Sequence, residues 1–203
     1  MKVVEVFADI ACPFTHVGLR RFWSHRQEVG VTVPILRVRA WPLELVNGHA
    51  LDGPSLAPKV VALRAEVALD LFAGFNPDRF PATTLPALAA EVAAYRQGPE
   101  VGETFSLAVR WALFEDGLDV SDEDVLRELR EPRGVPEPTR ADRASVHDDL
   151  LEGQRRGVAG SPHFFTAGGD YFCPSLDIQH DDSGYNVSFD AVGYHRFVSS
   201  VFG

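Results

Sequence analysis

Cysteine, excess positive charge and long apolar runs are all scarce in this sequence. Two cysteines among 203 residues are too few for a scaffold built on disulfides, which excludes the small disulfide-rich domains. The net charge of −10 argues against a nucleic-acid partner, because phosphate binding needs clustered lysine and arginine. No run approaches the roughly 18 to 20 apolar residues of a membrane span, and residues 1–14 lack the basic start of a signal peptide. We expect a cytoplasmic protein with reduced thiols and no membrane contact.

The first quarter of the chain predicts a β-α-β unit. Residues 2–10 are rich in β-branched and aromatic side chains and predict a buried strand. Pro13 suits the first turn of a helix over residues 14–29, and Gly30 suits its end. Residues 31–41 predict a second strand. Such an order favours a parallel pair of strands joined by a right-handed crossover.

The middle of the chain is predicted to be helical, and the end returns to strands. Capping patterns, Ser121 with Asp124 and Thr139 with Asp142, predict the starts of two helices. Ala167-Gly168-Gly169 predicts the turn of a hairpin. The segment 174–186 is predicted to be a loop that could form a lid or an oligomer contact. The helical runs are residues 56–72, 85–95, 100–115, 121–130, 139–156 and 189–202, and the hairpin strands are residues 162–166 and 170–173.

Cys12 is the first candidate for chemistry, because it follows the first strand and precedes a helix. Unpaired N–H groups and the helix dipole at such a position stabilise an anion. A thiol there can have a pKa lowered from about 8.5 into the range of about 3.5 to 7.5, which makes it a nucleophile at neutral pH. The alternative is a buried cysteine that behaves as a small hydrophobic side chain. The segment alone leaves these two interpretations balanced.

Three segments together resemble the thioredoxin superfamily. They are the strand–Cys-Pro–helix unit within residues 4–18, the segment 157–165 with Ser161-Pro162 before a strand, and residues 107–125 with their capping pattern. The helical block between the two α/β halves resembles the DsbA-like branch, in particular the FrnE-type proteins and the 2-hydroxychromene-2-carboxylate isomerases. The resemblance implies a cis peptide bond at Ser161–Pro162.

The resemblance also implies the division of the chain. The fold class is α/β, a thioredoxin-like fold with an inserted all-helical subdomain. Residues 1–45 and 151–203 are expected to form the two halves of the thioredoxin-like core, and residues 46–150 the helical insertion.

The motif of this chain is Cys-Pro-Phe-Thr, whereas the family's usual motif has a second cysteine at the position of Thr15. A dithiol oxidoreductase uses that cysteine to resolve a mixed disulfide. The predicted function is therefore a thiol–disulfide oxidoreductase with Cys12 as its single nucleophile, a low-molecular-weight thiol such as glutathione or mycothiol as co-substrate and no tightly bound cofactor. One alternative is a glutathione-dependent isomerase or kappa-class transferase, whose position corresponding to Cys12 holds serine. The other is a binding protein that has lost redox turnover.

Cys173 is a candidate resolving thiol. A turn at residues 167–169 would place it opposite His163 or Phe164, beside the loop of Pro162. A slip of one residue would turn it to the other face, and a packed free cysteine at a strand end is the commoner case.

Other residues near the motif are assigned by the same reasoning. Thr15 could donate a hydrogen bond to the Cys12 thiolate, and His16 could act as a base or as a cation that lowers the thiol pKa. A helical histidine that faces solvent is the commoner case, and His163 is equally ambiguous. The residues expected to hold the substrate or thiol are Pro13, Phe14, Ser161 and Pro162. The expected partner is a small-molecule or protein thiol or disulfide, with a homodimer as a further expectation.

Two further groups of residues are weaker candidates for a functional site. Residues 178–182 contain His180 and neighbouring acids in a predicted loop, without the spacing of a metal site. Five residues could line an apolar substrate cleft, although most such side chains are core residues: Trp41, Pro42, Phe72, Phe75 and Phe80.

Overall fold

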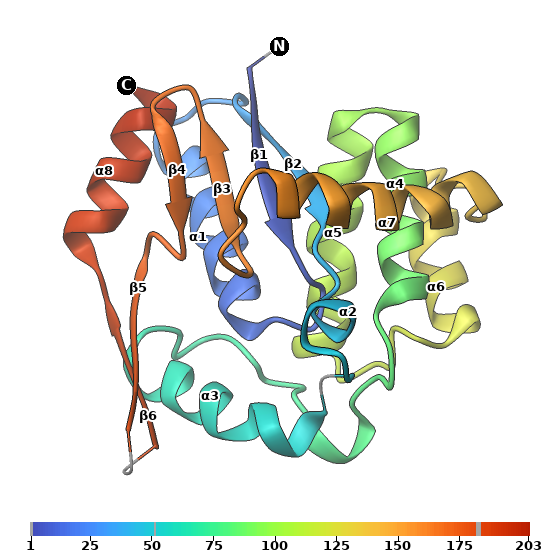
Figure 1. The fold of residues 1–203 in the computed structure, drawn as a ribbon, viewed down its shortest axis with the longest axis horizontal. Coiled ribbons are helices and arrows are strands. Elements are labelled where there is room, and N and C mark those ends of the chain that lie inside the picture. The colour runs from blue at the N-terminus through green and yellow to red at the C-terminus, as the bar shows by residue number, and fades with distance from the viewer. Residues whose placement is uncertain (1, 51, 182–183) are drawn as a thin grey trace.

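The computed structural model describes residues 2–50, 52–181 and 184–203. Its main sheet has the strand order β2-β1-β3-β4 (Figure 1). β1 pairs in parallel with β2 and antiparallel with β3, which pairs antiparallel with β4. The bounds are β1 (Val3–Ala8), β2 (Ile35–Ala40), β3 (His163–Thr166) and β4 (Gly169–Phe172). The predicted β-α-β start and the hairpin are confirmed.

Helices cover both faces of this sheet because its central strand alternates between two cores. Val6 on β1 belongs to the core with Phe22 of α1 (Pro13–Glu28) and Phe197 of α8 (Ala191–Phe202). The next residue, Phe7, packs edge-on against Trp41 on the opposite face, where α7 (Arg140–Arg155) crosses the sheet (Figure 1). A side chain at Gly153 of α7 would collide with Trp41, so this helix lies close to the sheet.

The segment between β2 and β3 is helical, as predicted. Its second core contains Phe105 and Phe114 together with a run of buried alanines in α4, which lets α4 and α5 approach closely. The helices that precede α7 are α2 (Leu43–Asn47), α3 (Gly53–Glu66), α4 (Leu85–Gln97), α5 (Pro99–Phe114) and α6 (Glu123–Arg130), with short 3-10 turns at Pro77–Arg79 and Glu131–Arg133.

Several helix boundaries differ from the sequence prediction, and two of them matter most. The cap of α6 is Asp122, whose carboxylate accepts the N–H of Asp124 at 2.8 Å, so the prediction of Ser121 as cap is wrong by one residue. α3 ends at Glu66 rather than at residue 72, because the backbone of Val67 leaves the helical conformation, with a φ of −134°. The capping box of Thr139 and Asp142 is present as predicted.

The segment 174–186 is a second hairpin rather than a loop, and this prediction is wrong. β5 (Leu176–Asp181) pairs antiparallel with β6 (Gly184–Phe189), and residues 182 and 183 lie outside the described part of the chain. Val187 is buried and pairs with Ile178, and β6 packs against α3. Apolar residues alternate with polar ones in both strands, Leu176 and Ile178 in β5 and Tyr185, Val187 and Phe189 in β6. This alternation is a strand signal that the prediction missed.

Within the described residues, no helix is both long enough and apolar enough to cross a membrane.

Candidate functional site

The candidate site lies where β1 runs into α1, at the end of the sheet nearest α2 and α3 (Figure 1). Cys12 is the N-cap residue of α1 and Pro13 occupies the first turn, where a missing N–H costs no helical hydrogen bond. The Cys12 Sγ lies 3.0 Å from the backbone oxygen of Ser161. Residues 149 positions apart in the chain therefore meet at one hydrogen bond.

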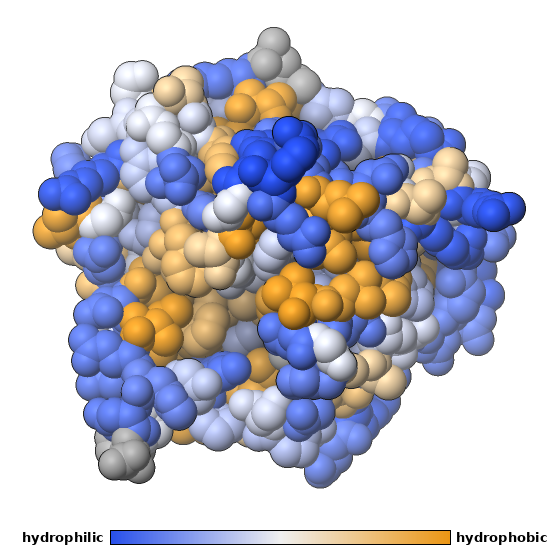
Figure 2. All heavy atoms as spheres, viewed as in Figure 1, coloured by the Kyte–Doolittle hydropathy of each residue, from blue (hydrophilic) through white to orange (hydrophobic). Residues whose placement is uncertain are grey.

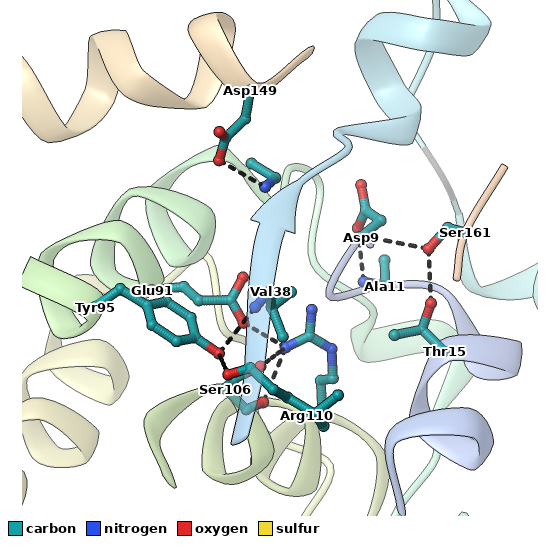
Figure 3. Close-up of polar contacts among 12 residues, drawn as sticks. Asp9, Ala11, Thr15, Val38, Glu91, Tyr95, Ser106, Arg110, Asp149 and Ser161 are labelled. Carbon is teal, nitrogen blue, oxygen red and sulfur yellow. Dashed lines mark hydrogen bonds and ion pairs between the residues drawn. The ribbon is translucent and has the colours of Figure 1, made fainter. Parts of the chain in front are cut away.

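The Ser161–Pro162 loop is fixed from three directions. Its peptide bond is cis, and a Cβ at Gly18 of α1 would lie 3.2 Å from the Pro162 ring, so the helix and the loop are in close contact. The Ser161 hydroxyl accepts the N–H of Asp9 at 2.8 Å and lies 2.6 Å from the Thr15 hydroxyl (Figure 3). These contacts hold the Ser161 carbonyl against Cys12.

Asp9 is a buried acid of this site that the sequence prediction missed. Its carboxylate accepts the N–H groups of Ala11 and Leu43, both at 2.7 Å, and the hydroxyl of Thr84 at 3.2 Å. Burial raises the pKa of Asp9 to about 6, although these hydrogen bonds and the charge of Arg110 act in the opposite direction. An acid at the end of an apolar strand, three residues before the cysteine, was the available signal.

The pKa of Cys12 is raised rather than lowered, contrary to the sequence expectation. Cys12 is 4% exposed, and burial raises its pKa above the ordinary value, while the nearby polar groups of Thr15 and Ser161 lower it by less. Its side chain makes no capping hydrogen bond with the first turn of α1. The backbone N–H of Thr15 acts to lower the pKa of Cys12, but this effect is smaller than that of burial. A thiol that donates to a carbonyl oxygen is the protonated form, and burial favours that form.

Thr15 and His16 lie in the same turn of α1 and face different partners. Thr15 is fully buried and its hydroxyl bonds to that of Ser161. The His16 Nε2 lies 2.7 Å from the Glu115 carboxylate, and its ring contacts Phe72 and Phe114. The expectation that His16 faces solvent is therefore wrong, because the helical block covers this side of α1.

Burial lowers the pKa of His16, partly offset by Glu115. Burial alone would raise the pKa of Glu115, but hydrogen bonds from His16 and from the N–H groups of Phe72 and Ala73 lower it below its ordinary value. The neutral ring and the charged carboxylate thus form a buried pair, and no local pattern in the sequence indicated Glu115.

The Cys173 thiol points at the same carbonyl oxygen as the Cys12 thiol, that of Ser161. The hairpin register pairs His163 with Phe172, so Cys173 follows the last pair and its N–H donates to the Pro162 oxygen at 3.0 Å. The register prediction was wrong by one or two residues, but Cys173 does lie beside the Pro162 loop. Its Sγ is 3.9 Å from the Ser161 oxygen.

The remaining candidates contact residues other than the two cysteines. His163 is buried, its Nδ1 accepts the N–H of Ala159, and its Nε2 lies 3.0 Å from Asp170. Phe14 is half-buried against the core of the helical block. Phe72, Phe75 and Phe80 pack in one aromatic cluster around Phe114. Phe72 and Trp41 are buried, whereas Phe75 and Phe80 are partly exposed.

Among residues 2–50, 52–181 and 184–203, no group of three His, Cys, Asp or Glu side chains is arranged to hold a metal ion.

A family model for the DsbA-like thioredoxin domain matches residues 3–180. The chain belongs to the DsbA-like family. Two solved structures show the same fold. The cytosolic disulfide reductase DsbM from Pseudomonas aeruginosa, solved with GSH, has a TM-score of 0.64 at 16% identity, with 83% of this chain and 87% of that chain covered. A 2-hydroxychromene-2-carboxylate isomerase has a TM-score of 0.62 at 17% identity, with 84% and 88% covered. No curated protein sequence matches this chain.

Proposed function

We propose that this DsbA-like protein is a thiol–disulfide oxidoreductase in which Cys12 is the nucleophile and a low-molecular-weight thiol, such as glutathione or mycothiol, is the final reductant. The observation that carries the proposal is the contact of 3.0 Å between the Cys12 Sγ and the Ser161 carbonyl oxygen at the start of α1. It joins a thiol to the backbone group that, by family resemblance, binds an extended substrate. A reducing cytoplasm contains such thiols, so we place the reaction there.

In the substrate-free protein this contact masks the nucleophile. The Cys12 thiol donates to Ser161, and burial opposes its ionisation. A substrate N–H that takes over the Ser161 oxygen displaces the thiol proton from it, and the proton passes to solvent. The thiolate is then formed at the N-terminus of α1, where the helix dipole favours negative charge.

The reaction is a two-electron exchange. The Cys12 thiolate attacks one sulfur of the substrate disulfide, the substrate S–S bond breaks, and the leaving sulfur departs as a thiolate that takes a proton. One molecule of the low-molecular-weight thiol then attacks the Cys12 sulfur, releases the remaining half of the substrate as a thiol and forms a mixed disulfide with Cys12. A second molecule attacks the sulfur of the first, so Cys12 leaves as a thiol and the two molecules depart as a disulfide.

The surface beside the site suits a partly apolar substrate. Leu45 and Val46 on α2 and Phe172 on β4 are all at least 39% exposed. Figure 2 shows apolar surface gathered in the middle of this face, over α2 and toward the ends of β3 and β4. A disulfide in a protein segment or in an apolar small molecule would bury part of this surface on binding.

One observation favours a second candidate, a glutathione-dependent isomerase or transferase. Cys12 is held as a hydrogen-bond donor to a carbonyl, which is a role that a serine hydroxyl can also fill. Serine stands at this position in the isomerases and kappa-class transferases that the sequence resembles. In that case the Cys12 sulfur would position glutathione rather than attack a disulfide.

Steady-state reduction of a glutathione mixed disulfide separates these functions. Wild type is assayed with reduced glutathione as electron donor, beside Cys12→Ser and Cys12→Ala. We expect both variants to lose turnover completely. The second candidate would be selected if glutathione binds and if isomerase or transferase activity survives in Cys12→Ser. If no disulfide modifies the wild-type thiol, the protein would be a binding protein.

A further inference from the structure

Both cysteines of the chain point at the same atom. The Cys12 Sγ lies 3.0 Å and the Cys173 Sγ 3.9 Å from the backbone oxygen of Ser161. The distance between the two sulfurs therefore cannot exceed these two lengths combined. A disulfide needs an S–S distance of about 2 Å. To form one, the two cysteine side chains must turn away from the Ser161 carbonyl oxygen and toward each other.

The backbone at Cys173 has an unusual conformation for its residue type. Its φ is +42°, and among the described non-glycine residues only Phe72 shares a positive φ. The conformation is held by the hydrogen bond from the Cys173 N–H to Pro162 and by one from the Leu176 N–H to the Cys173 oxygen. Such a conformation is unfavourable for a side chain with a Cβ and persists only where surrounding contacts enforce it. Here it turns a thiol toward the loop that also holds Cys12.

We propose that Cys173 is the resolving thiol of this protein. It takes the role of the family's second motif cysteine, whose position holds Thr15 in this chain. The proposal rests on the proposed function of Cys12 as nucleophile, and it inserts an internal Cys12–Cys173 disulfide between the mixed disulfide and the final reductant.

The step balances as an ordinary thiol–disulfide exchange. After Cys12 has attacked a substrate disulfide, the Cys173 thiolate attacks the Cys12 Sγ. The bond between Cys12 and the substrate breaks, the Cys12–Cys173 bond forms, and the substrate leaves as a thiolate that takes up a proton. The substrate has then gained two electrons and the protein has lost two. The low-molecular-weight thiol reduces the internal disulfide in a separate reaction.

Charge and burial favour this order of events. Burial raises the pKa of Cys173, and negative charge on Cys12 raises it further. A mixed disulfide at Cys12 carries no charge on sulfur, so ionisation of Cys173 is easier beside it than beside a Cys12 thiolate. Both thiols lie against the same carbonyl oxygen, so Cys173 is already beside the sulfur of the mixed disulfide, whereas an external thiol must first reach it.

The test is to equilibrate the reduced full-length protein with a mixture of reduced and oxidised glutathione, quench it with acid, alkylate it and measure its mass. Wild type is expected to lose its two thiol hydrogens together without retaining glutathione, and peptide mapping without reductant should link the Cys12 and Cys173 peptides. Cys173→Ser is expected to retain one glutathione on Cys12. Ser175→Ala, a buried change in the same turn, is the matched control and should behave as wild type.

The outcomes separate the two proposals. If wild type retains glutathione on Cys12 while Cys173 remains open to alkylation, as in Cys173→Ser, the resolving role is overturned and the nucleophile stands. If oxidised glutathione modifies Cys12 in neither protein, the proposed function itself fails. Cys173→Ala serves as a second variant, and its thermal unfolding shows whether a lost internal disulfide reflects a missing thiol or a disordered hairpin.

Discussion

The two sides of the first turn of α1 hold different kinds of polar contact. On one side, Cys12 and Thr15 meet the carbonyl and hydroxyl of Ser161, which are all uncharged groups. On the other side, His16 meets the carboxylate of Glu115 between two phenylalanine rings. These residues are neighbours in the sequence, yet only the first side contains the sulfur. A histidine beside a cysteine motif therefore need not belong to the thiol chemistry, because the partner that the fold supplies decides its role.

The largest effect on stability is expected from breaking the His16 side. Glu115→Ala leaves His16 and the N–H groups of Phe72 and Ala73 without their acceptor. Each buried donor that is left without its acceptor costs about 1 to 3 kcal/mol, and up to three donors lose theirs here. Urea unfolding should show a loss of that size, while the exposed Asp116→Ala stays near wild type.

If the His16–Glu115 pair takes no part in the thiol chemistry, folded Glu115→Ala should still form the same Cys12 products with oxidised glutathione. A mixed disulfide that no longer forms in a variant of intact fold would place the His16 pair within the thiol chemistry.

A smaller effect is expected from the pH dependence of Asp9, which lies beneath the Cys12 side. Its pKa is about 6 in the folded protein against 3.8 for the free group. The native state thus keeps a proton that the unfolded state has released, so folding free energy from this group is lost as pH rises from about 4 to about 6, and the loss amounts to about 3 kcal/mol.

Asp9→Asn removes this titration. The difference between the wild-type and Asp9→Asn unfolding free energies, measured by urea across this range, should change with pH in that direction. Taking the difference cancels the opposite contribution of His16, whose lowered pKa costs stability as pH falls below its ordinary value. A difference that stays constant with pH would mean that Asp9 is ionised in the folded protein throughout.

The smallest effect is expected from Thr15→Val, which keeps the shape of the side chain and removes its hydroxyl. The lost hydrogen bond to Ser161 should cost about 1 kcal/mol of unfolding free energy. Since Thr15 also opposes the rise in the pKa of Cys12, alkylation of Cys12 at fixed pH should become slower. Thr32→Val, an exposed change, is the control. Unchanged alkylation would confine Thr15 to a structural role.

Most elements of the fold could be predicted from local sequence patterns. Pro13 after Cys12, the capping box of Thr139 and Asp142, and the turn at Gly168 and Gly169 act within a few residues of chain. They identified α1, α7 and the β3–β4 hairpin. The β5–β6 hairpin was missed although its strands alternate apolar and polar residues, because the many Gly, Ser and Asp residues of this segment were interpreted as a loop. Packing against α3 then buries the face that contains Val187.

The residues that form the site could be predicted from the sequence, whereas the protonation of Cys12 could not. Cys12, Thr15, Ser161 and Pro162 come together as the motif suggested, and Asp9 could have been found from its place before the cysteine. The pKa of Cys12 could not, because it depends on how completely the loop and helices exclude water from the sulfur. Here the cost of burying a charge outweighs the groups at the helix start, including the Thr15 backbone, that lower the pKa of Cys12.

Residue types and short spacings were enough to predict most of the elements in order, the DsbA-like family and the absence of a second cysteine in the Cys-Pro-Phe-Thr motif. The folded chain was needed to show that His16 pairs with Glu115, that the Cys12 thiol is buried against the Ser161 carbonyl oxygen and that the Cys173 thiol points at that same oxygen. Each of these depends on atoms brought together from distant parts of the chain, and on the water that their packing excludes.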